Sequence, residues 1–196
     1  MSFDDLKGLL GLTLRNPEGA AAVLMRTGLP MQARWMALFV AVAVSAILAW
    51  ISAQMFPLPE GEAMVLSLTA QPLAMAGMQL CAIVLAAGLM ATIGRLCGGQ
   101  GSFADALLLT VWIEVVLLVV QAVQVVATLV LPPLAGILGI LAVALFLWLT
   151  VHFTKALHGF RSGPKVFLGL IATAFLAGFA LSVIAAALGL FPEIPQ

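Results

Sequence analysis

Charged side chains are scarce in this sequence. Its 196 residues include only 8 Lys and Arg and 8 Asp and Glu, so 8% of the chain is charged and 64% is hydrophobic. Soluble domains carry about 25% charged residues, so this chain has too few charges to cover a surface that faces water. The net charge of zero gives no general attraction to nucleic acid. The composition therefore predicts an integral membrane protein with a lipid-facing surface and no nucleic-acid partner.

Motifs for catalysis and for metal or nucleotide binding are missing as well. The sequence contains no GxxxxGK[ST], GxSxG, HExxH or CxxC pattern. The glycine-rich run 98–102 lacks the lysine and the preceding strand of a phosphate-binding loop, whereas Ser102 followed by Asp105 fits a helix cap. Two cysteines, Cys81 and Cys97, make no disulfide framework. We therefore expect no enzyme activity, no metal site and no cofactor.

Long apolar runs are what the sequence does contain. There are five of them, at 35–56, 72–93, 106–131, 134–154 and 166–190. Each meets the requirement of about 20 residues for a helix that crosses a hydrocarbon core of about 30 Å. The predicted fold is all-α, with a polytopic bundle of five transmembrane helices over residues 35–196.

The loops between these runs alternate in charge sign. Lys and Arg occur only before the first run and in the loops after the second and fourth runs. The loop after the first run holds Glu60 and Glu62, and the carboxyl tail holds Glu193. Because Lys and Arg stay on the cytoplasmic side, the amino terminus is predicted to be cytoplasmic and the carboxyl terminus to lie outside.

Residues 1–34 form a separate amino-terminal segment with helix signals of its own. Asn16 fits a helix cap, Pro17 a first helical position and Gly28 a helix stop. The segment is predicted to form two short amphipathic helices that lie on the cytoplasmic membrane face.

Glu114 is the one ionisable residue well inside an apolar run. At about 100° per residue, Thr110, Glu114, Gln121 and Thr128 fall within about 40° of one another on the third helix. Lipid cannot satisfy such a polar face, so it is predicted to point into the bundle.

Two interpretations of this face remain open. It could line a path for a proton or solute, or Glu114 could be a neutral hydrogen-bonding group that locks the third helix to its neighbours. Gln79 and Thr150 are plausible partners for the second interpretation. The first interpretation normally needs several ionisable residues, and apart from Glu114 only His152 in the fourth run lies at a remotely similar depth.

Basic residues near the predicted cytoplasmic surface are candidate contacts for lipid headgroups. They are Arg15, Arg26, Arg95, Lys155, Arg161 and Lys165. His152 and His158 are six residues apart and do not share a helix face, so they are expected to join these bases at headgroups rather than to bind a metal. Glycines that begin small-residue pairs at four-residue spacing predict close helix contacts. They are Gly77, Gly88, Gly169 and Gly178.

The segment GRLCGGQGSF at 94–103 runs into Ala104-Asp105-Ala106-Leu107 and the region of Trp112. Together with the Asn16-Pro17 helix, the basic segment before the first run and the layout of the runs, it resembles the bacterial branch of the Yip domain family. That resemblance implies five helices, a cytoplasmic amino terminus, no enzyme activity and a place in the bacterial cytoplasmic membrane. Eukaryotic members associate with Rab-type GTPases and carry an Asp-Leu-Tyr-Gly-Pro motif. This chain contains no tyrosine, so that role is not carried over.

The function expected from these features is that of a membrane scaffold or accessory subunit, in contact with membrane lipids and with a membrane-protein partner or a second copy of itself. Two alternatives stay open. One is a small transporter or channel that uses the face of Glu114, Gln121 and Thr128. The other is a lipid-binding membrane protein that uses the basic residues of the loops.

Overall fold

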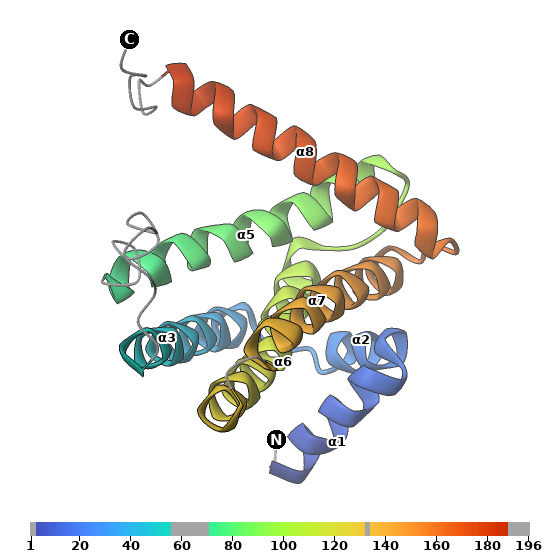
Figure 1. The fold of residues 1–196 in the computed structure, drawn as a ribbon. Helices are drawn as coiled ribbons and strands as arrows, with labels where there is room; N and C mark the ends of the chain where they lie inside the picture. The colour runs from blue at the N-terminus through green and yellow to red at the C-terminus, as the bar shows by residue number, and fades with distance from the viewer. Residues whose placement is uncertain (1–2, 56–70, 132–133, 188–196) are drawn as a thin grey trace.

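The computed structural model describes residues 3–55, 71–131 and 134–187, and the regular structure in these ranges is entirely helical. The helices, labelled in Figure 1, are α1 (Phe3–Arg15), α2 (Pro17–Arg26), α3 (Met31–Met55), α5 (Pro72–Leu96), α6 (Phe103–Val130), α7 (Leu134–His158) and α8 (Gly163–Ala187). The predicted all-α class is therefore confirmed.

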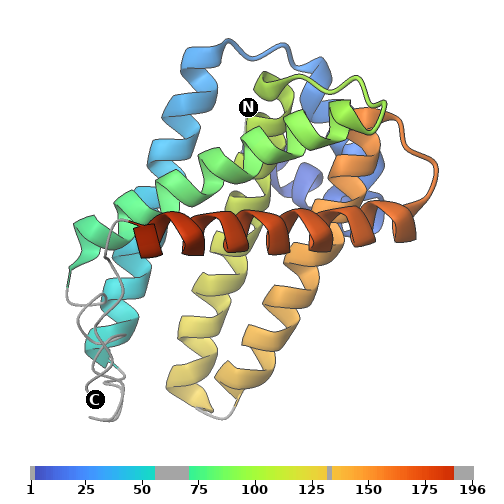
Figure 2. The same cartoon turned by 90° about the horizontal axis from the view of Figure 1, so that it is seen from above.

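Four helices are long and apolar enough to cross a membrane. They are α3, α5, α6 and the part of α7 from Gly136 to His158, whereas α8 counts as a shorter apolar helix over Gly163–Phe179. Figure 2 shows α3, α6 and α7 with roughly parallel axes, α7 running opposite to the other two, and α8 lying across α6 and α7. A fifth span thus stays a prediction. Residues 56 and 188–190 of the predicted spans, and Glu60, Glu62 and Glu193 of the charge argument, lie outside the described residues.

The centre of the bundle is the first half of α6. Its residues from Ala106 to Ile113 are buried without a break, because α6 packs against α3, α5, α7 and the amino-terminal α2. The second half exposes Val119, Val123 and Val126. Water would penalise such an apolar surface, whereas hydrocarbon covers it without cost.

The helices extend about one turn beyond the apolar runs, always on the same side. α3, α6 and α8 begin three or four residues before their runs, and α5 and α7 end three or four residues after theirs. We call the end of the bundle where α3 and α6 begin and where α5 and α7 end the basic end. Each of these extra turns contains a charged residue, so the apolar runs mark the hydrophobic part of each helix and not the whole of it.

Two helices, α2 and α6, begin with the caps that the sequence predicts. The Asn16 side chain accepts from the Gly19 N–H at 2.9 Å at the start of α2, and Ser102 Oγ accepts from the Asp105 N–H at 3.0 Å at the start of α6. Gly28, the predicted stop after α2, has a φ of 60°, a conformation that a side chain with a Cβ rarely adopts.

Candidate functional site

A network of four polar side chains joins three membrane helices. Gln79 of α5 donates through Nε2 to Glu114 Oε1 of α6 at 2.5 Å and to Ser45 Oγ of α3 at 3.2 Å. Ser45 Oγ in turn donates to Gln121 Oε1 at 3.2 Å, about two turns further along the same face of α6. The Gln121 Nε2 group donates to the Ser45 carbonyl oxygen at 3.4 Å.

The structure therefore selects one of the two partners proposed for Glu114. Gln79 is confirmed, whereas Thr150 donates to the Phe146 carbonyl of its own helix. Thr110 and Thr128 share the predicted face but also donate to carbonyls of their own helix, those of Ala106 and Gln124. Of the predicted face, only Glu114 and Gln121 enter the network.

This arrangement is suited to holding helices together. Each of α3, α5 and α6 contributes at least one side chain, and the network contains a single ionisable group. A hydrogen bond between membrane helices contributes about 0.6 kcal/mol on average. Several such bonds at one level fix the relative positions of the three helices.

The amino-terminal helices dock on the bundle instead of lying only on a membrane face. Trp112 of α6 donates from Nε1 to Thr13 Oγ1 of α1 at 2.9 Å, and Thr13 is completely buried. Ala20, Ala21 and Leu24 of α2 are buried as well, in the same core cluster as the start of α6. The two predicted helices are thus present, but their apolar face packs mainly on protein.

An ion-pair cluster fastens α2 to the end of α7. Glu18 Oε1 lies 2.6 Å from Lys155 Nζ and 2.9 Å from His152 Nδ1. The hydrogen bond from Lys155 and then that from His152 hold the pKa of the Glu18 carboxyl below its usual value. The cluster lies at the basic end, where His152 and Lys155 belong to the last two turns of α7 and Glu18 to the start of α2.

A second ion pair joins the starts of α3 and α6. Arg34 NH1 lies 3.0 Å from Asp105 Oδ1, and Arg34 also donates to the Leu29 carbonyl oxygen. Asp105 accepts from the Ser102 hydroxyl through its other oxygen at 2.7 Å. The carboxylate therefore holds the Ser102 hydroxyl that caps α6 and neutralises the nearly buried Arg34 guanidinium.

The basic residues predicted to contact lipid headgroups fall into two groups. Lys155 is partly buried and paired with Glu18, so its ammonium group is already engaged within the protein. The others are exposed and therefore accessible to lipid: Arg15, Arg26, Arg95, Arg161 and Lys165.

Comparison with known protein families matches the Yip1 domain to residues 11–184. The chain belongs to the Yip1 domain family. No curated protein and no solved structure matches it. The Yip1 domain thus covers α2 to α7 completely, together with most of α8 and the end of α1 from residue 11.

The glycine-rich segment of this Yip1 domain holds the side chain of His158. His158 Nδ1 accepts from the Gly101 N–H at 3.1 Å, and its Nε2 lies 3.0 Å from the Met90 carbonyl oxygen. The neutral imidazole with its proton on Nε2 satisfies both bonds. The prediction that His158 contacts headgroups is therefore wrong: the ring is buried between the end of α5 and the loop that leads to α6.

The glycines that surround the His158 ring have a steric cause. A Cβ on Gly94 or Gly99 would collide with the His158 ring, and one on Gly101 would collide with Leu157. This close contact of His158 was not predicted, although the clustering of glycines in 94–101 was a signal for it. The glycines predicted at helix contacts have open space instead, with nothing within 4 Å of an added Cβ at Gly77, Gly88, Gly169 or Gly178.

Proposed function

We propose that this Yip1-domain protein is a non-enzymatic, five-span protein of a bacterial cytoplasmic membrane, with its amino terminus in the cytoplasm, which acts as a scaffold or accessory subunit. The membrane helices and the family match support the membrane location. The orientation rests on the Lys and Arg residues, all of which belong to the amino-terminal segment or to loops on one predicted side.

The docked pair α1–α2 is the observation that carries the scaffold role. Its inner face is fixed to α6 and α7 by the Trp112–Thr13 hydrogen bond and the Glu18–Lys155 ion pair. Its outer face leaves Leu14 and Val23 about half exposed. We call these two residues, with the exposed Arg15 and Arg26, the outer patch. A rigid support with an apolar and basic outer patch is suited to docking of another protein at the membrane surface.

A transport path along α6 receives less support. Glu114 is hydrogen-bonded to α5, and Gln121 is hydrogen-bonded to α3. A path for a proton or solute along this face would have to break these bonds. The network nevertheless keeps a protonatable group within the bundle. Replacement of Glu114 by Gln therefore separates the two functions, because the amide can bond to Gln79 but cannot carry a titrating proton.

The test of the scaffold role is a pull-down of the tagged protein in mild detergent from its native membrane, with mass spectrometry of the bound proteins. We expect a stoichiometric membrane-protein partner, or a second copy, that is lost in the double variant Leu14→Ser/Val23→Ser. The control is Leu96→Ser, which removes an equally apolar, exposed side chain at the basic end but outside the outer patch. A wild-type chain that is recovered alone and monomeric would overturn the proposal.

The orientation has its own test. Cys97 follows α5 at the basic end and is exposed. In a Cys81→Ser variant, a membrane-impermeant maleimide should label Cys97 only after the cytoplasmic side is opened. Labelling of intact cells at the same rate would reverse the orientation.

A further inference from the structure

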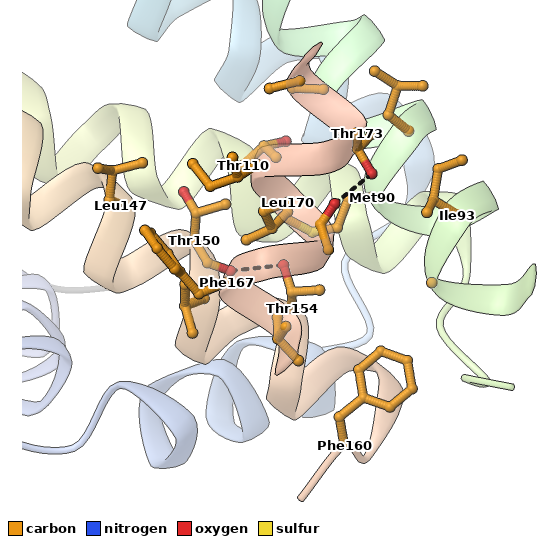
Figure 3. Close-up of a pocket in the computed structure, with 18 of the residues that line it drawn as sticks. Met90, Ile93, Thr110, Leu147, Thr150, Thr154, Phe160, Phe167, Leu170 and Thr173 are labelled. Carbon is orange, nitrogen blue, oxygen red and sulfur yellow. Dashed lines mark hydrogen bonds between the residues drawn. The ribbon is translucent and has the colours of Figure 1, made fainter. Parts of the chain in front are cut away.

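A large apolar cavity lies between α8 and the bundle. Its volume is about 650 Å³, and its walls come from α5, α6, α7 and α8. This volume falls within the range of about 300–1,000 Å³ for sites that bind small molecules. Figure 3 shows Met90, Thr110, Leu147 and Leu170 facing this space from the four helices.

The few hydroxyl groups in the walls do not make the cavity polar. Thr110, Thr150, Thr154 and Thr173 each donate to a carbonyl of their own helix. The bonds of Thr154 and Thr173 are visible in Figure 3. Glu114 lines the cavity too, but it is hydrogen-bonded to Gln79. The remaining surface is suited to hydrocarbon.

The cavity reaches the protein surface at two basic residues. Arg161 and Lys165 line it and are exposed. Within the part of the chain that the structure describes, neither residue takes part in an ion pair, unlike Arg34 and Lys155, which are paired with carboxylates. The lining positions of α8 extend from Lys165 to Ala174, about 13 Å along the helix. Two free cations therefore mark one end of an elongated apolar space.

We propose that this cavity binds one anionic phospholipid, with an acyl chain against α5, α7 and α8 and the phosphate beside Arg161 and Lys165. An apolar cavity of this size within a bilayer is filled by hydrocarbon, which water could not replace without losing hydrogen bonds. Basic side chains next to the hydrocarbon attract anionic headgroups. The proposal does not depend on the scaffold role, because it rests only on the cavity and on its charged end.

The occupant is a lipid rather than a protein helix for a reason of charge. A transmembrane helix of a partner would fill the apolar space but would leave Arg161 and Lys165 without a counter-charge. A soluble phosphate would satisfy the cations but would leave the apolar walls uncovered. An anionic phospholipid supplies both parts in one molecule.

The test measures lipid bound to the purified full chain in nanodiscs of phosphatidylglycerol and phosphatidylcholine, by native mass spectrometry after release. We expect one retained phosphatidylglycerol. Because each basic residue near an anionic surface contributes about a fivefold attraction, Arg161→Gln/Lys165→Gln should lower retention about 30-fold. Arg161→Gln alone should lower retention about fivefold. Its control Lys7→Gln, which removes the same charge from an exposed residue outside the cavity, should retain the lipid.

Two further measurements address the apolar part. Gly169→Leu adds a side chain into the cavity, where an added Cβ meets open space, and should lower retention with Arg161 and Lys165 intact. Cys97 also lines the cavity, so in a Cys81→Ser background its reaction with maleimide should slow as the phosphatidylglycerol fraction rises. Three outcomes would overturn the proposal. The wild type could retain both lipids equally, or the site could bind inorganic phosphate and no lipid. A partner helix could also protect Cys97 when phosphatidylglycerol is absent.

Discussion

Trp112 and Thr13 are 99 residues apart in the chain, and the indole N–H of the first donates to the hydroxyl of the second at 2.9 Å inside the protein. The Thr13 hydroxyl in turn donates to the Leu9 carbonyl oxygen at 2.7 Å. The link connects the middle of α6 to the last turn of α1. It is the most buried polar contact between the amino-terminal helices and the membrane bundle.

Replacement of Thr13 by Val should therefore loosen the amino-terminal helices. The change keeps the shape but leaves the Trp112 N–H without a partner, at a cost of about 1–3 kcal/mol. Thr13→Ser keeps the hydroxyl and should cost less. The measurement is unfolding in mixed micelles, together with proteolysis in the 1–30 region. The control Thr27→Val removes an exposed hydroxyl that bonds only to the adjacent Leu24 carbonyl and should change stability by less than about 0.5 kcal/mol. Equal effects of Thr13→Val and Thr27→Val would contradict this role.

The Glu114 network makes a second prediction. Glu114→Leu should destabilise the bundle by about 0.6–1.7 kcal/mol, the range of hydrogen bonds between membrane helices, whereas Glu114→Gln should cost less than about 0.6 kcal/mol. The reason is that a Gln side chain still offers an oxygen to Gln79 Nε2. Titration with sodium dodecyl sulfate measures both. If Glu114→Gln abolished movement of a proton or solute across the membrane while the fold stayed intact, the transport interpretation of Glu114 would replace the structural one.

The membrane helices could be predicted from the sequence because a long apolar run is a local property. Asn16 and Ser102 were predicted as caps for the same reason, since a cap acts within three residues. The Gln79–Glu114 pair could be predicted as one of two candidate pairs, because both residues are isolated polar groups within apolar helices.

Contacts between distant segments were not accessible in this way. Lys155 carries the same charge as Arg161, and nothing local shows that Glu18 lies beside only the first of them. His158 reads as a surface residue because it follows Lys155 in a basic loop, yet the packing of α5 against α7 buries it. The direction of α8 across α6 and α7 depends on tertiary packing as well, and the apolar run at 166–190 carries no sign of it.

The contact of His158 with the glycine-rich segment makes a third prediction. Gly94→Ala should be destabilising by about 1–3 kcal/mol, because the new methyl group overlaps with the imidazole and the ring must move away from Met90 and Gly101. Gly77→Ala is the matched control in the same helix. It adds the same methyl group in open space and should be neutral or stabilising by up to about 1 kcal/mol, because Ala favours a helix over Gly. Thermal unfolding of both variants in one detergent compares them, and an equal loss in both would show that His158 does not set the requirement for glycine.

The Glu18 cluster makes stability depend on pH. Since the folded state holds the pKa of Glu18 below its usual value, through Lys155 and then His152, the pair stabilises the protein fully above the usual carboxyl range. That stabilisation is lost as the pH falls through the lowered pKa. Glu18 is more than a third exposed, so the contribution is at most about 1 kcal/mol.

Glu18→Gln should therefore destabilise the protein at about pH 7 and match the wild type at a pH below the lowered pKa of Glu18, where both side chains are neutral. Asp4→Asn, which removes an exposed carboxylate from α1, is the control. Its stability should change between the two pH values by the same amount as that of the wild type. Unfolding curves at both pH values measure the effect, and limited proteolysis between α2 and α3 locates it. A Glu18→Gln variant that was weaker than the wild type by the same amount at both pH values would mean that the side chain acts through packing and not through its charge. In that case the buried side chains of α2, and not its charge, would hold it against α7.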